Sequence, residues 1–256
     1  MAGWDPAVYQ RYKAYRDRPA LDLMVQVPAD LAPREIWDLG CGTGEHAAVL
    51  ASRHPYATVH GLDSSPEMLA KARARSTRVH WVQGDIAGFH PDVAPDLIFT
   101  NAALHWLPGL SRLVPRLLST LAPGGVFACQ VPLSHSAAWY DALRETIAEG
   151  PWADRLRDVE GTQAVPPAED WHAWLAPNST YVDIWTTTYL HALEGDDPIV
   201  DWMSGTGLRP YLAALPDEAE RQAFCAVYGR RLAPLFPRRD GITLLPFPRL
   251  FVIARR

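Results

Sequence analysis

Cysteine is scarce in this sequence, and its few cysteines lie too far apart along the chain to form a recognisable site. Cys41, Cys129 and Cys225 are odd in number and form no Cys-x-x-Cys pair. This pattern argues against a disulfide framework and against a zinc site, so we predict no metal centre. Cys41 lies inside a glycine-rich segment, where we expect a small residue in a tight turn rather than a nucleophile.

Long apolar runs and an excess of positive charge are absent as well. No segment approaches the roughly 20 apolar residues of a membrane-spanning helix, and the beginning of the chain contains no apolar signal core. The formal net charge is −5, whereas nucleic-acid-binding surfaces are usually basic. We therefore expect a cytoplasmic protein with no membrane or nucleic-acid partner, either a monomer or a weak homo-oligomer.

The first half of the chain alternates between strand-like and helix-like segments. The strands are predicted at 35–39, 58–62, 79–83, 96–100 and 126–131, and the helices at 45–53, 66–75 and 110–121. This alternation predicts an α/β fold, a doubly wound parallel sheet with right-handed crossovers. Ligands of such sheets bind beyond the carboxyl ends of the strands.

The second half has a different texture, rich in tryptophan and proline. A strand is predicted at 181–190 and a last strand at 250–254, and 197–235 is helical in pieces broken at Gly205, Gly207, Pro210 and Pro216. We interpret 197–236 as a helical insertion, a lid over the active site, within a single domain of residues 1–256. Residues 134–179 carry no pattern that we recognise.

The segment Asp38-Leu39-Gly40-Cys41-Gly42-Thr43-Gly44-Glu45 follows the first predicted strand. Its glycines have the spacing G-x-G-x-G, not the G-x-G-x-x-G of a dinucleotide loop, and no Gly-Lys-Ser/Thr of a nucleotide-triphosphate loop is present. Asp38 and Glu45 would repel a phosphate, because phosphate sites favour cations and helix N-termini. Two acids instead suit a cofactor with a positive centre and an ammonium group, such as S-adenosylmethionine (AdoMet).

Polar side chains also follow the next strands, where a parallel sheet gathers its ligand-binding residues. Asp63 is placed to accept hydrogen bonds from ribose hydroxyls. Asp85 and Ile86 are placed for an adenine ring, and Asn101 for the methionyl part. The alternative for each acid is a helix cap or an Asx-turn. Their order along the chain, one per strand end, favours the cofactor interpretation.

These residues resemble the cofactor motif of the class I AdoMet-dependent methyltransferases. The resemblance implies a Rossmann-like sheet of seven strands, mostly parallel, with the last strand antiparallel. It also implies which residues bind the cofactor: Trp4, Tyr9, Asp38, Gly40, Gly42, Asp63, Ser64, Met68, Asp85, Ile86 and Asn101.

Blocks outside that motif resemble the trans-aconitate 2-methyltransferase family over nearly the whole chain. They are Trp4-Asp5-Pro6, Arg18-Pro19-Ala20, residues 101–107, residues 182–189, Asp201-Trp202, residues 206–210 and Phe247-Pro248-Arg249-Leu250-Phe251. This resemblance implies methyl esterification of a small polycarboxylic acid, most closely trans-aconitate, with S-adenosylhomocysteine and a monomethyl ester as products.

A carboxylate acceptor needs no general base, because it is already ionised at neutral pH. We therefore expect positioning to dominate and predict no catalytic residue beyond the candidate His105. Arginine suits the remaining carboxylates because its planar group forms two parallel hydrogen bonds. The candidate substrate-binding residues are Tyr9, Arg18, His105, Trp106, Tyr189, Trp202, Arg209 and Arg249. Among the arginines, Arg209 and Arg249 are the leading pair, expected to bind the carboxylates that do not react. For Arg209 and Arg249 the alternative is a structural ion pair, and for Arg18 a surface or capping role. For His105 it is a partly buried structural histidine, and for the aromatic residues ordinary packing.

Other functions remain open at this point. A methyltransferase acting on another small acid or on an acyl-carrier thioester is the enzymatic alternative. A non-catalytic AdoMet-binding regulatory or scaffold protein is the other. A nucleic-acid methyltransferase acting on exocyclic amines is disfavoured, because Asn101 is followed by Ala102-Ala103-Leu104 rather than by Pro-Pro-aromatic.

Overall fold

The computed structural model describes residues 13–256, which form two compact units. We call the first the sheet unit; it comprises Asp17–Pro132, Pro166–Thr187 and Leu250–Arg256. We call the second the helical unit; within the described residues it comprises 13–16, Leu133–Val165 and Thr188–Arg249. Two long strands run through both units.

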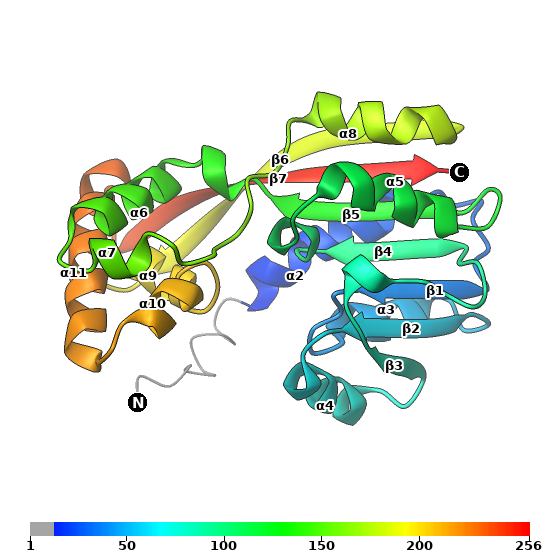
Figure 1. Cartoon of the computed structure of the whole chain (residues 1–256), viewed down its shortest axis with the longest axis horizontal. Helices are drawn as coiled ribbons and strands as arrows, with labels where there is room; N and C mark the ends of the chain where they lie inside the picture. The colour runs from blue at the N-terminus through cyan, green and yellow to red at the C-terminus, as the bar shows by residue number, and fades with distance from the viewer. Residues whose placement is uncertain (1–12) are drawn as a thin grey trace. The chain divides into compact units, whose positions relative to one another are not determined.

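The sheet has seven strands in the order β3-β2-β1-β4-β5-β7-β6, with the last strand antiparallel to the others, as predicted (Figure 1). The strands are β1 (Glu35–Leu39), β2 (Thr58–Asp63), β3 (Val79–Gln83), β4 (Leu97–Asn101), β5 (Val126–Pro132), β6 (Tyr181–Glu194) and β7 (Ile242–Arg255). The five predicted strands of the first half are confirmed to within one residue at each end. Strands of such sheets are covered on both faces, and accordingly every residue of β5 is buried.

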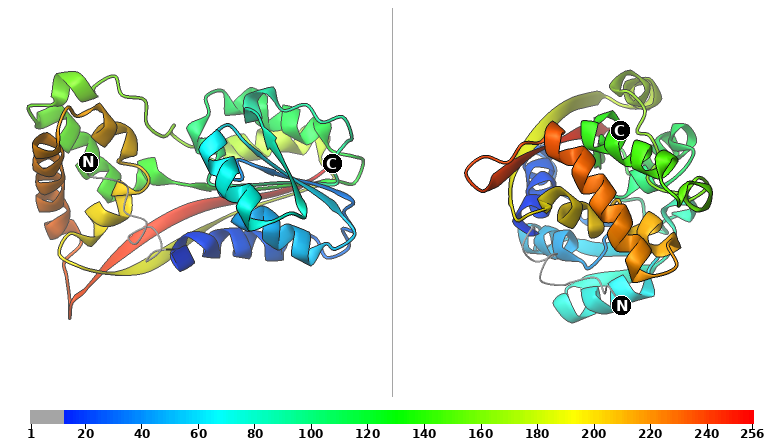
Figure 2. Two further views of the ribbon diagram at one scale, coloured as in Figure 1. Left: turned by 90° about the horizontal axis from the view of Figure 1, so that it is seen from below. Right: turned by 90° about the vertical axis from the view of Figure 1, so that its left-hand side faces the viewer.

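Helices cover both faces of the sheet. On one face lie α2 (Lys13–Gln26) and α3 (Glu45–Arg53), and on the other α5 (Leu110–Thr120) and α8 (Ala168–Leu175) (Figure 2). Between β2 and β3 runs α4 (Pro66–Arg75), which begins as predicted, with the Ser65 hydroxyl accepting a hydrogen bond from the Met68 N–H and proline in its first turn.

The two last strands are longer than predicted. We expected 181–190 and 250–254, but β6 and β7 each contain 14 residues. Pro246 and Pro248 lie within β7, although proline cannot donate to a strand ladder. They lie two positions apart, so both missing donors fall on the same side of the strand. The carbonyl of Pro248 still accepts a hydrogen bond from the N–H of Leu133.

The helical unit contains the helical pieces predicted after residue 197, together with helices from the segment that carried no recognisable pattern. The elements are α6 (Ala138–Glu149), α7 (Ala153–Leu156), α9 (Pro198–Ser204), α10 (Arg209–Ala214) and α11 (Glu218–Leu235). Gly205, Gly207 and Pro216 lie between helices as expected. Pro210 does not break a helix: it lies in the first turn of α10, where its missing N–H has no intrahelical partner to lose.

Candidate active site

The glycine segment forms a sharp turn between β1 and α3. Gly40, Gly42 and Gly44 all have positive φ, at 74°, 55° and 80°. A side chain at Gly40 would also overlap the Cβ atom of Ala103, which follows β4. The turn therefore needs glycine both for its backbone conformation and for the close approach of the next loop.

Asp63 lies beside this turn. Leu39 pairs with Leu62 in the parallel register, so the ends of β1 and β2 are adjacent. The Asp63 carboxylate accepts hydrogen bonds from the N–H groups of Gly42 and Ser65, each at 2.8 Å. Asp63, which we predicted to bind the ribose, thus also supports the loop and the start of α4. Its carboxylate oxygens retain lone pairs for further donors.

Asp38 lies at the same edge of the sheet, and only 1% of its surface is exposed. Burial is the main cause that raises the pKa of its carboxyl to about 8; the charges of Asp63 and Glu45 raise it further, while a hydrogen bond from the Ala47 backbone opposes the shift. Its Oδ2 atom has no hydrogen-bond partner among the described residues. A buried acceptor of this kind is costly unless a ligand satisfies it.

Arg75 joins this group, although the sequence did not single it out. Its guanidinium donates to the Thr43 carbonyl at 2.9 Å and to the Glu45 carboxylate at 2.6 Å. The Thr43 hydroxyl donates to Glu45 as well. Glu45, which we expected to attract a cationic cofactor, is therefore already paired with a cation of the protein. No sequence pattern indicated this pair, because the two residues are 30 positions apart.

Polar and apolar groups from the next two strand ends complete this edge. Asp85 is exposed and caps η1 (Ile86–Gly88), accepting from the Ala87 N–H at 2.9 Å, while Ile86 is buried. Asn101 ends β4, and its Oδ1 atom is buried with no hydrogen-bond partner among the described residues. The next residue, Ala102, has φ of 52°, a conformation that non-glycine residues rarely adopt and that recurs at functional sites.

The remaining predicted residues of the sheet unit differ in exposure. Ser64 is exposed and Met68 half-buried at the start of α4. His105 is buried in η2 (Leu104–Trp106), whereas its neighbour Trp106 is 41% exposed. Arg18 is exposed on α2, 3.7 Å from the Asp22 carboxylate. Trp4 and Tyr9 lie outside the described residues.

Three of the predicted substrate-binding residues lie buried in the helical unit: Tyr189, Trp202 and Arg249. The Arg249 guanidinium lies 4.8 Å from the ring centre of Phe247. Burial lowers the pKa of Arg249 to about 10, and the charge of Arg16 contributes to this decrease. Arg209, the intended partner of Arg249, is instead exposed at the first position of α10.

Sequence reasoning missed His191 in this part of the molecule. The residue is buried in β6, and its ring stacks on Trp202 with 4.6 Å between the ring centroids. The only sequence signal for it is its position two residues after Tyr189, because side chains two positions apart on a strand lie on the same face.

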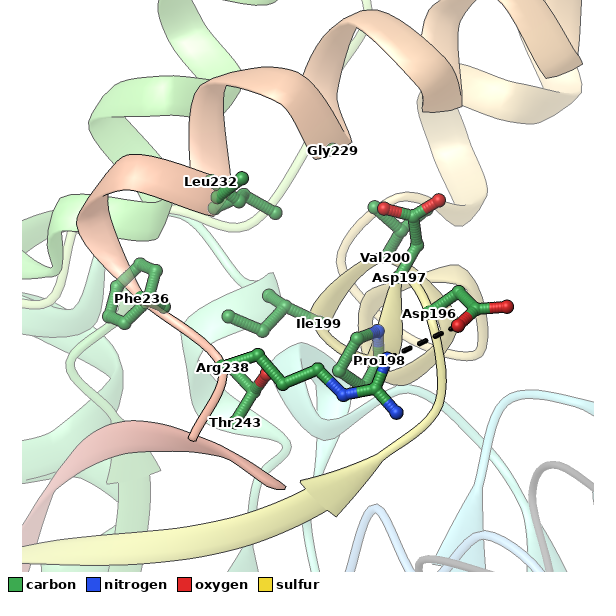
Figure 3. A pocket seen from close by; sticks show the side chains of 11 residues that line it. Asp196, Asp197, Pro198, Ile199, Val200, Gly229, Leu232, Phe236, Arg238 and Thr243 are labelled. Atoms are coloured by element: carbon green, nitrogen blue, oxygen red, sulfur yellow. Dashed lines mark hydrogen bonds and ion pairs between the residues drawn. The ribbon is translucent and has the colours of Figure 1, made fainter. Parts of the chain in front are cut away.

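The helical unit also contains a pocket that holds none of the predicted site residues. It encloses about 400 Å³, including space open to solvent. Figure 3 shows its apolar walls and the Arg238–Asp196 ion pair at its rim.

Within the described part of the chain, no helix is long and apolar enough to cross a membrane. No cluster suited to a metal ion occurs among the same residues.

Comparison with known proteins decides the family. The methyltransferase domain family matches residues 36–125. A trans-aconitate 2-methyltransferase from Methylobacterium nodulans is 45% identical over 258 aligned positions, which cover 100% of this chain and 99% of the relative. The chain belongs to the trans-aconitate 2-methyltransferase family.

Solved structures agree on the fold of this family member. The YcgJ protein of Bacillus subtilis matches with a TM-score of 0.61 at 18% identity, covering 93% of this chain and 98% of that one. Phosphoethanolamine N-methyltransferase 2 of Haemonchus contortus, solved with S-adenosylhomocysteine, matches with a TM-score of 0.59 at 14% identity, covering 93% of this chain and 52% of that one. At such identities these structures support the fold alone.

The cofactor of this trans-aconitate 2-methyltransferase family member is AdoMet, and the groups at the sheet edge fit it. The orphaned oxygens of Asp38 and Asn101 are acceptors suited to a cationic ligand. Glycine at position 40 places no Cβ atom against Ala103. Asp38 and Glu45 flank the turn, and such acids disfavour a phosphate but not AdoMet, which has none. The assignment of individual residues to parts of the cofactor stays a prediction.

Proposed function

We propose that this protein transfers a methyl group from AdoMet to a carboxylate of trans-aconitate. The observation that carries the proposal is the 45% identity to a trans-aconitate 2-methyltransferase over the full length of both chains. Similarity of this extent includes the helical unit, whose residues lie outside the general methyltransferase motif and are therefore the ones that bear on the acceptor.

In the sheet unit, the proposed role of the residues is to bind and orient the cofactor. When bound, AdoMet supplies an electrophilic methyl group on a positively charged sulfur. Asp63 holds the glycine turn and accepts from ribose hydroxyls, and Asp38 and Asn101 accept from the positively charged methionyl part. Ile86 provides an apolar contact for the adenine ring. None of these residues removes a proton, which agrees with an acceptor that is already ionised.

In the helical unit, Arg249 is proposed to bind a carboxylate that does not react. It is nearly fully buried, and a charge–charge interaction is stronger where water is excluded. Tyr189 and Trp202 are proposed to line the same site. Arg209 and Arg18 remain candidates from the sequence, but their exposure weakens the attraction that each can offer.

The test is transfer of radiolabelled methyl from AdoMet to a panel of tricarboxylates, dicarboxylates, monocarboxylates and acyl thioesters. Trans-aconitate should be the best acceptor, with S-adenosylhomocysteine formed in equal amount. Arg249→Gln should lower kcat/KM for trans-aconitate while the affinity for AdoMet changes little, and Arg249→Lys should not restore it, because the forked geometry is lost.

The matched control is Arg230→Gln, which removes the same charge from an exposed position on α11. A wild-type protein that prefers a monocarboxylate or a thioester would favour the acyl-acceptor alternative. Binding of AdoMet without transfer to any acid would favour a regulatory or scaffold protein.

A further inference from the structure

A second guanidinium lies in the helical unit near Arg249, on a residue that the sequence did not single out. Arg16 belongs to α2, and its Nη2 atom donates to the Trp202 carbonyl at 3.3 Å. The guanidinium also lies 5.1 Å from the centre of the Trp202 ring. A side chain at Gly205 would come within 3.1 Å of the same Nη2 atom, so glycine there leaves room for Arg16.

Arg16 and Arg249 are placed against one cluster of stacked rings. Arg16 lies over Trp202 and Arg249 over Phe247, and these two ring centroids are 5.9 Å apart. His191 lies 4.6 Å from the first ring and 5.8 Å from the second. We call Trp202, Phe247 and His191 the ring cluster. It orients both guanidinium groups by cation–π contact, and the planar fork of a guanidinium matches the shape of a planar acceptor such as a carboxylate.

The charges of the two arginines are coupled. Arg249 is 5% exposed, and the positive charge of Arg16 adds to the effect of burial in lowering its pKa. Like charges held near one another in a poorly hydrated setting repel, and an anion bound beside them is attracted by both. Two forked donors match two carboxylates, because each guanidinium can engage one carboxylate through two bonds.

We propose that Arg16 is the second substrate-binding arginine, and that Arg16 and Arg249 each bind one carboxylate of a polycarboxylate acceptor. The inference rests on the proposed function and specifies which residues confer preference for polycarboxylates. It replaces Arg209 as the partner of Arg249, since Arg209 is exposed to solvent and an exposed ion pair contributes little.

The decisive experiment compares Arg16→Gln with wild type on trans-aconitate and on acids with one carboxylate fewer or two fewer. For trans-aconitate, KM should rise about thirtyfold or more while kcat changes little, as expected when a buried carboxylate loses its cation. The preference for the tricarboxylate over the smaller acids should shrink by a similar factor. Arg16→Lys should lose less than Arg16→Gln but should not match wild type. The control variant Arg230→Gln should behave like wild type on all the acids.

Several outcomes would overturn the inference. One is a kcat/KM of Arg16→Gln on trans-aconitate within threefold of wild type. Another is an equal loss on all acids together with weaker AdoMet binding, which would assign Arg16 to folding alone; thermal melting of both Arg16 variants monitors this.

Direct binding separates this inference from the proposed function. If the wild type transfers no methyl group to any polyacid, the proposed function fails, and calorimetry with trans-aconitate decides about Arg16. If the wild type binds trans-aconitate and Arg16→Gln weakens this binding at least tenfold, the inference about Arg16 is supported. No binding by the wild type, or equal binding by both proteins, refutes it.

Discussion

The Asp63 carboxylate is bonded directly to the glycine turn, through a hydrogen bond of 2.8 Å from the Gly42 N–H to Oδ2. Its other oxygen accepts from the Ser65 N–H at the same distance. One side chain therefore holds two loops in place at the edge of the sheet while keeping lone pairs for a ligand. This double role makes Asp63 the first residue to test.

Asp63→Ala should weaken AdoMet binding by about 1.5–3 kcal/mol, because hydrogen bonds to a charged group are lost. Isothermal titration calorimetry measures the change. Asp92→Ala, at an exposed position, is the control and should bind as wild type does. An affinity of Asp63→Ala equal to that of wild type would rule out the ribose assignment.

The pH dependence of cofactor binding should depend on Asp38. Its pKa in the folded protein, about 8, is far above the unfolded value of 3.8. Between these values the folded state holds a proton that the unfolded state has lost, so Asp38 makes the ligand-free protein less stable as pH rises through this window. A cation bound beside it favours the ionised form, so binding releases that proton.

AdoMet affinity should therefore increase from pH about 6 to about 8 by up to roughly tenfold per pH unit and then level off. Titrations in buffers of different ionisation enthalpy count the released protons. Asp38→Asn should bind more weakly at high pH and lose this part of the pH dependence. Persistence of the full proton release in Asp38→Asn would assign it to another group.

Gly40→Ala should destabilise the fold more than Gly109→Ala. Both positions have similar positive φ, 74° and 71°, which costs an alanine roughly 1–2 kcal/mol. A Cβ atom at Gly109 meets nothing within 4 Å, whereas one at Gly40 overlaps Ala103. Overpacking should add about 1–3 kcal/mol at Gly40. Urea unfolding compares the two variants, and equal losses would contradict the close approach of the Ala103 loop.

Arg75→Gln should weaken AdoMet binding moderately, since Arg75 positions the glycine turn through Thr43 and Glu45 without being part of the turn. The ion pair is partly exposed, so we expect an effect of about 1 kcal/mol or less, up to roughly fivefold in Kd. Lys71→Gln removes a more exposed ion pair from the same helix and should leave Kd unchanged. A larger effect of Lys71→Gln would indicate a general loss of α4.

Amide hydrogen exchange in α9 should slow when trans-aconitate and S-adenosylhomocysteine are bound together. Trp202 lies in α9 and supports the Arg16 guanidinium, so a substrate bound there should stabilise this helix. The prediction also tests the lid expected at 197–236, whose Gly205 and Gly207 lie directly after α9. Unchanged exchange across 197–209 would contradict both ideas, and α3 serves as the internal reference for cofactor binding alone.

The sequence alone predicted the sheet and the residues at its edge. Asp38, Gly40, Asp63, Ile86 and Asn101 each lie at or just beyond the carboxyl end of a strand. Parallel strands bring these ends to one edge whatever the rest of the fold does. Short-range pattern is therefore enough to place these residues together. The long β7 was missed because two prolines resemble a strand break unless the side of the missing donors is known.

The environment of the arginines depended on tertiary structure. Arg16 and Trp202 are 186 positions apart, and Arg75 reaches Thr43 across 32. Local sequence patterns carry no information on which distant segment packs over a charged side chain, so Arg249 and Arg209 looked equivalent. Burial separates them: Arg249 lies in a poorly hydrated environment beside a second cation, where its charge attracts an anion strongly, whereas the charge of the exposed Arg209 is screened by water.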